Sequence, residues 1–231
     1  MSIAENVARI RREMDDAARA AGRDPKEIKL CAATKMNDAD AVRQAIAAGV
    51  DCCGENRVQE LVKKNSEDAY RGAPVHFIGH LQTNKVRQVV GSVDLIQSVG
   101  SLRLLTAIDA EAKKQGIVQN ILLEINVARE AAKTGFYPEE VLPLLDQIGN
   151  FSNICMRGLM SIPPIPQNPG DNLYFFQKIS QLSVDIMEKK YDNVLVDCLS
   201  MGMSADFSEA IRSGATMIRI GTAIFGPRNH T

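Results

Sequence analysis

The feature that most limits the fold of this chain is an alternation of eight short apolar runs with stretches of helical spacing. Strands that alternate with helices pair in parallel through helical crossovers. Eight such units predict a closed (β/α)8 TIM barrel of the α/β class, preceded by an extra amino-terminal helix within residues 1–22. A doubly wound open sheet is the structural alternative. The predicted strands are residues 29–34, 51–55, 76–79, 95–99, 120–126, 156–161, 194–200 and 217–221.

The segments between these runs carry helical spacing, and several end at a glycine that can stop a helix. One stretch breaks the rhythm: residues 162–172 (IPPIPQNPGDN) are dense in proline and glycine and predict a loop. Strands continue at the same rhythm on both sides of this loop, so residues 1–231 are expected to form a single domain. The predicted helices are residues 40–48, 84–90, 101–115, 138–149, 173–189 and 205–213.

Charge and hydropathy exclude several classes of protein. The formal net charge is −1, so no overall basic field favours nucleic acid or an anionic membrane. No apolar run approaches the roughly 20 residues of a membrane span. The amino terminus has no signal-peptide core. We therefore expect a cytoplasmic protein.

The five cysteines form no recognisable metal or disulfide motif. Cys31, Cys155 and Cys198 lie in strand-like runs, where a thiol behaves as a small buried hydrophobe. Cys52 and Cys53 are adjacent and cannot readily pair with each other. Without a CxxC or Cys/His spacing, the sequence predicts reduced structural thiols and no metal site.

Polar residues collect where the predicted strands end, which is the catalytic face of an α/β barrel. The most informative is Lys35, which directly follows the first strand; Asn37 and Asp38 can then cap a helix. An amine held this way can form a Schiff base with an aldehyde, although most lysines after strands are only solvated. The predicted ring comprises Lys35, Glu55, Asn56, His80, Ser98, Asn126, Ser161, Ser200, Gly221 and Thr222.

The last two strands predict a phosphate site. The segment LSMGMS (199–204) carries two hydroxyls and a glycine before a helix, and RIGTAIFG (219–226) follows. Barrels often hold phosphate with the loops after strands seven and eight. The alternative is ordinary turn chemistry with Ser204 as a helix cap. Arg219 interrupts an apolar run, so its guanidinium either faces outward or serves a ligand acceptor.

Six segments together resemble the pyridoxal phosphate homeostasis proteins, the single-domain relatives of the alanine racemase amino-terminal barrel. They are ATK (33–35), GENRVQE (54–60), HFIGHLQTNK (76–85), RGLM (157–160), LSMGMSADFSEAI (199–211) and RIGTAIFG (219–226). The resemblance covers essentially the whole chain, in order. It implies the same barrel and pyridoxal 5′-phosphate (PLP) as the cofactor.

The resemblance also implies roles for individual residues. Lys35 matches the lysine that forms the Schiff base with PLP. Ser200, Gly221 and Thr222 match residues that hold its phosphate, helped by backbone around Met201 and Ser204. Arg219 matches the arginine that faces the pyridine nitrogen, and Asn56 matches an asparagine near the cofactor. His80 stands where some relatives carry proline and is assigned no essential role.

These roles predict a PLP-binding protein of vitamin B6 and amino-acid homeostasis that is not an efficient enzyme. A guanidinium beside the pyridine nitrogen disfavours protonation of that nitrogen and weakens the ring as an electron sink. Racemases need two bases on opposite faces of a carbon, and none of the tyrosines (Tyr70, Tyr137, Tyr174 and Tyr191) is an evident second base.

The resemblance leaves open which partners the protein has. We expect transfer of PLP to PLP-dependent apoenzymes. The chain ends soon after the eighth strand, without the β domain that contributes to racemase dimers, so we expect a monomer. The alternatives are a small PLP-dependent racemase, a cofactor-free Schiff-base aldolase and a protein-interaction barrel.

Overall fold

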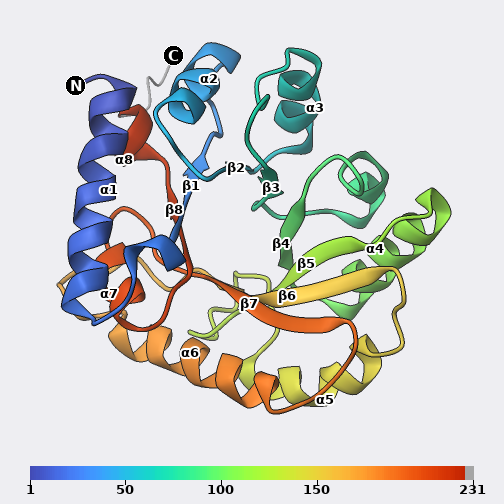
Figure 1. The fold of residues 1–231 in the computed structure, drawn as a ribbon. Helices are drawn as coiled ribbons and strands as arrows, with labels where there is room; N and C mark the ends of the chain where they lie inside the picture. The colour runs from blue at the N-terminus through green and yellow to red at the C-terminus, as the bar shows by residue number, and fades with distance from the viewer. Residues whose placement is uncertain (227–231) are drawn as a thin grey trace.

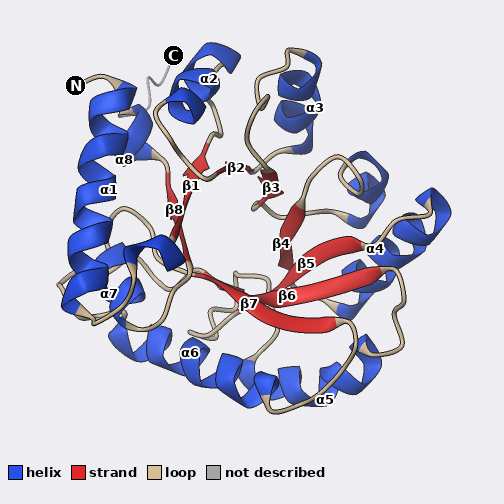
Figure 2. Cartoon of the chain, viewed as in Figure 1, coloured by secondary structure: helices blue, strands red, loops and turns tan. Residues whose placement is uncertain are grey.

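Eight parallel strands close into a barrel in the order β1 to β8. The structure is a computed structural model that describes residues 1–226; the last five residues of the predicted domain, 227–231, lie outside the described residues. Figure 2 shows the strands as an inner ring with the helices around it. The strands are β1 (Lys29–Ala33), β2 (Cys52–Glu55), β3 (Val75–Phe77), β4 (Leu95–Val99), β5 (Gln119–Ile125), β6 (Ile154–Ser161), β7 (Val194–Ser200) and β8 (Met217–Ile220).

The first and last strands close the ring. They pair in parallel, from Lys29 beside Met217 to Ala32 beside Ile220. This pairing confirms the predicted (β/α)8 barrel and rules out the open sheet.

The helices cover the outside of the barrel. Helix α1 is the predicted extra amino-terminal helix, and a capping box of Ser2 and Glu5 starts it. Figure 1 shows α1 beside α7 and α8, and Asn6 donates to the carbonyl oxygen of Ile224 at 2.9 Å. The α-helices are α1 (Ile3–Ala20), α2 (Ala39–Ala47), α3 (Val58–Ser66), α4 (Leu102–Gln115), α5 (Pro138–Ile148), α6 (Leu173–Met187), α7 (Phe207–Arg212) and α8 (Thr222–Phe225); η1 (Pro25–Glu27) and η2 (Thr83–Gln88) are 3₁₀ helices.

Four helical elements differ from the prediction, and one of them is the 3₁₀ helix η1, for which no helix was predicted. The segment predicted as a helix over residues 84–90 is the 3₁₀ helix η2. Helix α3 was not predicted, because its buried face includes Lys64 where helical spacing calls for an apolar residue. The short helix α8 begins directly after Gly221, inside a run too apolar to show helical periodicity.

The strands have two different buried faces. Leu30, Ala32 and Cys53 belong to the main apolar core together with residues of the helices. Their neighbours Cys31 and Cys52 instead form a separate buried cluster with Met217. This alternation is expected of strands with one face toward the helices and the other toward the barrel interior. No helix within residues 1–226 is long and apolar enough to cross a membrane.

Candidate functional site

A cavity of about 610 Å³ lies beside the residues that follow β1, β2, β7 and β8. The carboxyl ends of the strands are the functional face of an α/β barrel. Five of the six predicted cofactor-binding residues line this cavity, and Ser200 does not. The five are Lys35, Asn56, Arg219, Gly221 and Thr222.

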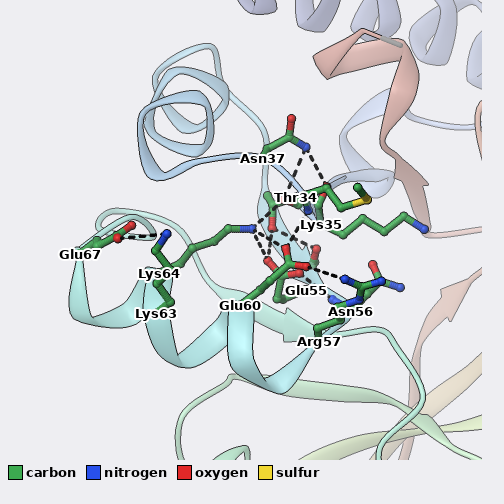
Figure 3. A network of polar contacts seen from close by, with 12 residues as sticks. Thr34, Lys35, Asn37, Glu55, Asn56, Arg57, Glu60, Lys63, Lys64 and Glu67 are labelled. Carbon is green, nitrogen blue, oxygen red and sulfur yellow. Dashed lines mark hydrogen bonds and ion pairs between the residues drawn. The ribbon is translucent and has the colours of Figure 1, made fainter. Parts of the chain in front are cut away.

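Lys35 lies in a turn between β1 and α2. It directly follows β1, and Met36 beside it has a φ of 61°, a left-handed conformation that is uncommon for a non-glycine residue. Asn37 donates from its side chain to the Lys35 carbonyl oxygen at 3.0 Å, and Asp38 caps α2 as predicted. In Figure 3 the Lys35 side chain extends away from the α3 ion pair.

A buried ion pair lies directly behind this turn. Lys64 of α3 donates to Glu55 Oε2 at 2.6 Å and to the Thr34 carbonyl oxygen at 2.7 Å. The same carboxylate oxygen accepts from the Thr34 hydroxyl at 3.0 Å and from the Tyr70 hydroxyl at 3.1 Å. Burial raises the pKa of Tyr70 far above its usual value, so its hydroxyl remains a donor.

Hydrogen bonds connect the ion pair to the other neighbours of Lys35. Glu60 lies near Lys64, at 3.4 Å, and accepts from the Met36 backbone N–H at 2.7 Å. Glu55 Oε1 accepts from the Asn56 backbone N–H at 2.9 Å. The residues before and after Lys35 are thus fixed by one network, which sets the direction in which the Lys35 side chain leaves the backbone (Figure 3).

Arg219 presents a buried guanidinium to the cavity. Its side chain donates to the carbonyl oxygens of Ser200 and Ser161, both at 2.8 Å. No carboxylate within residues 1–226 forms an ion pair with it. Burial lowers the pKa of Arg219, but a guanidinium stays charged in proteins. A cation without a carboxylate partner favours an anion or a lone pair in the cavity.

Ser200 forms hydrogen bonds with Arg219 and does not line the cavity. It is fully buried, accepts from Arg219 at 2.6 Å and donates to Gln97 Oε1 at 2.7 Å. Ser204, which carries the other hydroxyl of the LSMGMS segment, lines the same cavity as Gly221 and Thr222. Ser204 thus lines the cavity, whereas Ser200, for which the resemblance implies a phosphate role, does not.

Asn56 contributes an unsatisfied acceptor. Its Oδ1 is buried and has no hydrogen-bond donor among the described residues. Buried amide oxygens are rarely left without a partner. The cavity wall therefore offers a place for a donor on a bound molecule.

The proline-rich loop predicted over residues 162–172 forms the remaining wall. Ile162, Pro164 and Ile165 line the cavity. Lys133 donates to the carbonyl oxygen of Ile162 at 3.1 Å, and Asn172 donates to that of Pro164 at 2.9 Å. These bonds hold the loop over the cavity.

The rest of the predicted polar ring is dispersed. His80 and Ser98 line a neighbouring hollow, and Asn126 lines a third. Glu55 faces Lys64, as described above. The sequence correctly placed these residues at strand ends, but only the side chains from the strands near β1 and β8 converge with Lys35.

Comparison with known proteins agrees with this geometry. The family of alanine racemase N-terminal domains matches residues 2–229. A pyridoxal phosphate homeostasis protein of Aquifex aeolicus is 40% identical over 230 residues, covering 100% of both chains. One from Pseudomonas aeruginosa is 38% identical, covering 99% of this chain and 97% of the relative. The chain belongs to the family of pyridoxal phosphate homeostasis proteins.

Solved structures of this family share the barrel. PipY of Synechococcus elongatus PCC7942, solved with PLP bound, is 31% identical with a TM-score of 0.84. The alignment covers 97% of this chain and 100% of PipY. An alanine racemase of Clostridium difficile is 14% identical with a TM-score of 0.73, and only 56% of that longer chain is covered. The racemase thus shares the barrel fold alone.

Proposed function

We propose that this protein binds PLP at Lys35 and serves PLP and amino-acid homeostasis in the cytoplasm without efficient catalysis. The observation that carries this proposal is that Lys35 and Arg219 line the same cavity. The names of the curated relatives and the PLP-bound PipY support it.

The residues of the cavity fit this cofactor. PLP supplies an aldehyde that condenses with an amine and a pyridine ring that withdraws electrons. Lys35 supplies the amine, and Arg219 supplies a donor for the ring nitrogen. Ser204, Gly221 and Thr222 would hold the phosphate with Ser200 as a support of Arg219, and Asn56 Oδ1 would accept from a ring substituent.

The same residues argue against racemisation. The Arg219 cation disfavours a proton on the pyridine nitrogen, so the ring stabilises a substrate carbanion poorly. None of the tyrosines, all of which lie in the described part of the chain, lines the cavity. Asp206 does line it, but its two oxygens already accept from the Met203 backbone N–H and the Asn172 side chain. No tyrosine among the described residues is therefore placed to act as a second base opposite Lys35.

A carrier role implies partners and an assembly state. We propose that PLP passes to PLP-dependent apoenzymes, because a competing amine can displace Lys35 from the aldehyde. We also propose that the protein is a monomer. Sedimentation of the PLP-loaded protein at several concentrations tests the monomer, and a dimer at the lowest concentration would contradict it.

The first experiment compares absorption spectra of wild type, Lys35→Ala and Lys63→Ala after addition of PLP. Lys63 is a control because its side chain is 75% exposed on α3. We expect a yellow band with wild type and Lys63→Ala, and borohydride should fix the label on the Lys35 peptide. A labelled wild type in which Lys35 is unmodified would overturn the assignment.

A second assay separates the carrier from a racemase. The rate of D/L interconversion of amino acids is measured with PLP-loaded protein and with free PLP at equal concentration. We expect no acceleration by the protein. Acceleration that is lost in Lys35→Ala would establish the racemase instead.

A further inference from the structure

Three potential metal ligands converge at the amino end of the barrel, away from the Lys35 cavity. They are Cys31 on β1, Cys52 on β2 and His76 on β3, and their ligand atoms all lie within 4.8 Å of one another. Cys31 and Cys52 are direct neighbours in the parallel register of β1 and β2. The three side chains are 0%, 2% and 7% exposed, respectively. The proposed function uses none of them.

This donor set suits zinc in chemistry and in size. Zinc is held by cysteine sulfur at about 2.3 Å and by histidine nitrogen at about 2.0 Å, so tetrahedral donors stand roughly 3.5–3.8 Å apart. Closing the present spacing needs side-chain shifts of about 1 Å. When the ion binds, both thiols release a proton, and two thiolates with a neutral imidazole then balance the charge of a divalent ion, which lowers the cost of burying it.

The surroundings supply further soft ligands. Met217 of β8 packs in the same buried cluster as Cys31 and Cys52, and Cys198 packs against that cluster. A thioether, a third thiol or water can complete four-coordination, and sulfur ligands select thiophilic metals.

His76 lies beside an amide that can give it the support a metal-bound histidine requires. Its Nδ1 lies 2.9 Å from Gln97 Nε2, and Gln97 Oε1 accepts from Ser200. Ligating histidines donate their other ring N–H to an oxygen. A half-turn of the Gln97 amide would present Oε1 to Nδ1–H and leave Nε2 for the metal, while the amide nitrogen would replace Oε1 beside the Ser200 hydroxyl.

An opening leads from the surface to His76 and Met217 at one side of this cluster. A second cavity of about 250 Å³ is lined by His76, Met217 and Cys198, with Asp94 and Asp197 also in its wall. It shares no wall residue with the Lys35 cavity. Acidic and basic side chains are mixed in this wall, since Lys29 and Arg157 also line it and Arg157 pairs with Asp197.

We propose that Cys31, Cys52 and His76 bind one zinc ion that ties together the first three strands of the barrel. The site lies outside the Lys35 cavity, and Gln97 and Ser200 connect it to Arg219. Linear motifs cannot reveal it, because each ligand comes from a different strand.

The test measures zinc binding by purified full-length protein under reducing conditions. Competition with a chromophoric chelator gives the number of zinc ions bound per chain. Cobalt in place of zinc gives a thiolate charge-transfer band, which reports cysteine ligands. We expect one equivalent in wild type and loss of both signals in Cys52→Ala and His76→Gln. Cys53→Ala is the matched control, since Cys53 is adjacent and fully buried but belongs to the main apolar core. Zinc should raise the wild-type Tm by about 5–10 °C at a hundredfold excess over Kd.

Lys35→Ala separates this site from any chelation by PLP, and it should keep full zinc binding. If Cys52→Ala and His76→Gln are unable to fold, the number of zinc ions bound by wild type and the zinc-induced rise in its Tm decide whether the site exists. Less than stoichiometric binding without a Tm shift would overturn the proposal. Binding by folded Cys52→Ala and His76→Gln that equals wild type would also overturn it.

Discussion

The buried ion pair behind Lys35 makes a quantitative prediction for Lys64→Met. Lys64 and Glu55 are 5% and 0% exposed at their side chains, and their charged atoms lie 2.6 Å apart. Removing one partner of a buried pair leaves an uncompensated charge and costs about 3–5 kcal/mol. For a chain of this size that corresponds to a fall in Tm of roughly 6–20 °C. The structure also predicts looser PLP binding, because Lys64 holds the Thr34 carbonyl beside Lys35.

The neighbouring residue provides the control. Lys63 lies on the same helix, but it is 75% exposed and pairs with Glu67 at 3.8 Å. Exposed pairs contribute about 0–1 kcal/mol, so Lys63→Met should be nearly neutral. Chemical denaturation of both variants and of wild type gives the free energies of unfolding. A Lys64→Met variant that loses no more stability than Lys63→Met would refute the reasoning.

A double variant tests the physical cause. Glu55→Gln keeps an acceptor for Thr34 and Tyr70 but removes the charge that Lys64 balances. Lys64→Met combined with Glu55→Gln should therefore be more stable than Lys64→Met alone. Equal stabilities would show that lost packing, and not the unpaired carboxylate, causes the effect.

Four further variants test the backbone and the cavity. Gly158→Ala should cost about 3 kcal/mol or more in denaturation experiments, because φ is 138° and a Cβ would lie 1.9 Å from the Cys198 carbonyl oxygen. Gly22→Ala, with nothing within 4 Å of its Cβ, should cost only about 1–2 kcal/mol, and equal losses would contradict the clash. Gly221→Ala meets no atom closer than 3.4 Å and should fold normally, yet its methyl should weaken PLP binding at least about tenfold in a titration. Arg219→Gln should speed transamination by bound PLP, and an unchanged rate would argue against Arg219 facing the ring.

The strands were predictable because their signal is local. Residues 95–99 and 194–200 match β4 and β7 residue for residue, and the other predicted strands differ from the observed ones by one or two residues at their ends. Short apolar runs bounded by turn residues carry this information without tertiary contacts. The closed barrel then followed from the number of units.

Helix α3 and the orientation of Ser200 depended on tertiary contacts and could not be predicted in this way. Lys64 interrupts the apolar face of α3, and only its ion pair with Glu55 makes that position acceptable. Ser200 and Ser204 look equivalent in the sequence. The strand β7 ends at Ser200, which turns the Ser200 hydroxyl toward Arg219 inside the barrel and leaves the cavity wall to Ser204.

The pairing of β1 with β8 has a consequence for folding during synthesis. Lys29 and Met217 are about 190 residues apart, so closing the ring costs about 5 kcal/mol of chain entropy before the contacts form. At roughly 5–20 residues per second, a ribosome adds that length in about 10–40 s. Throughout this interval β1 has no partner for the edge that β8 will occupy. The nascent chain therefore passes through a stage with an open strand edge, at which pairing with another chain competes with completion of the barrel.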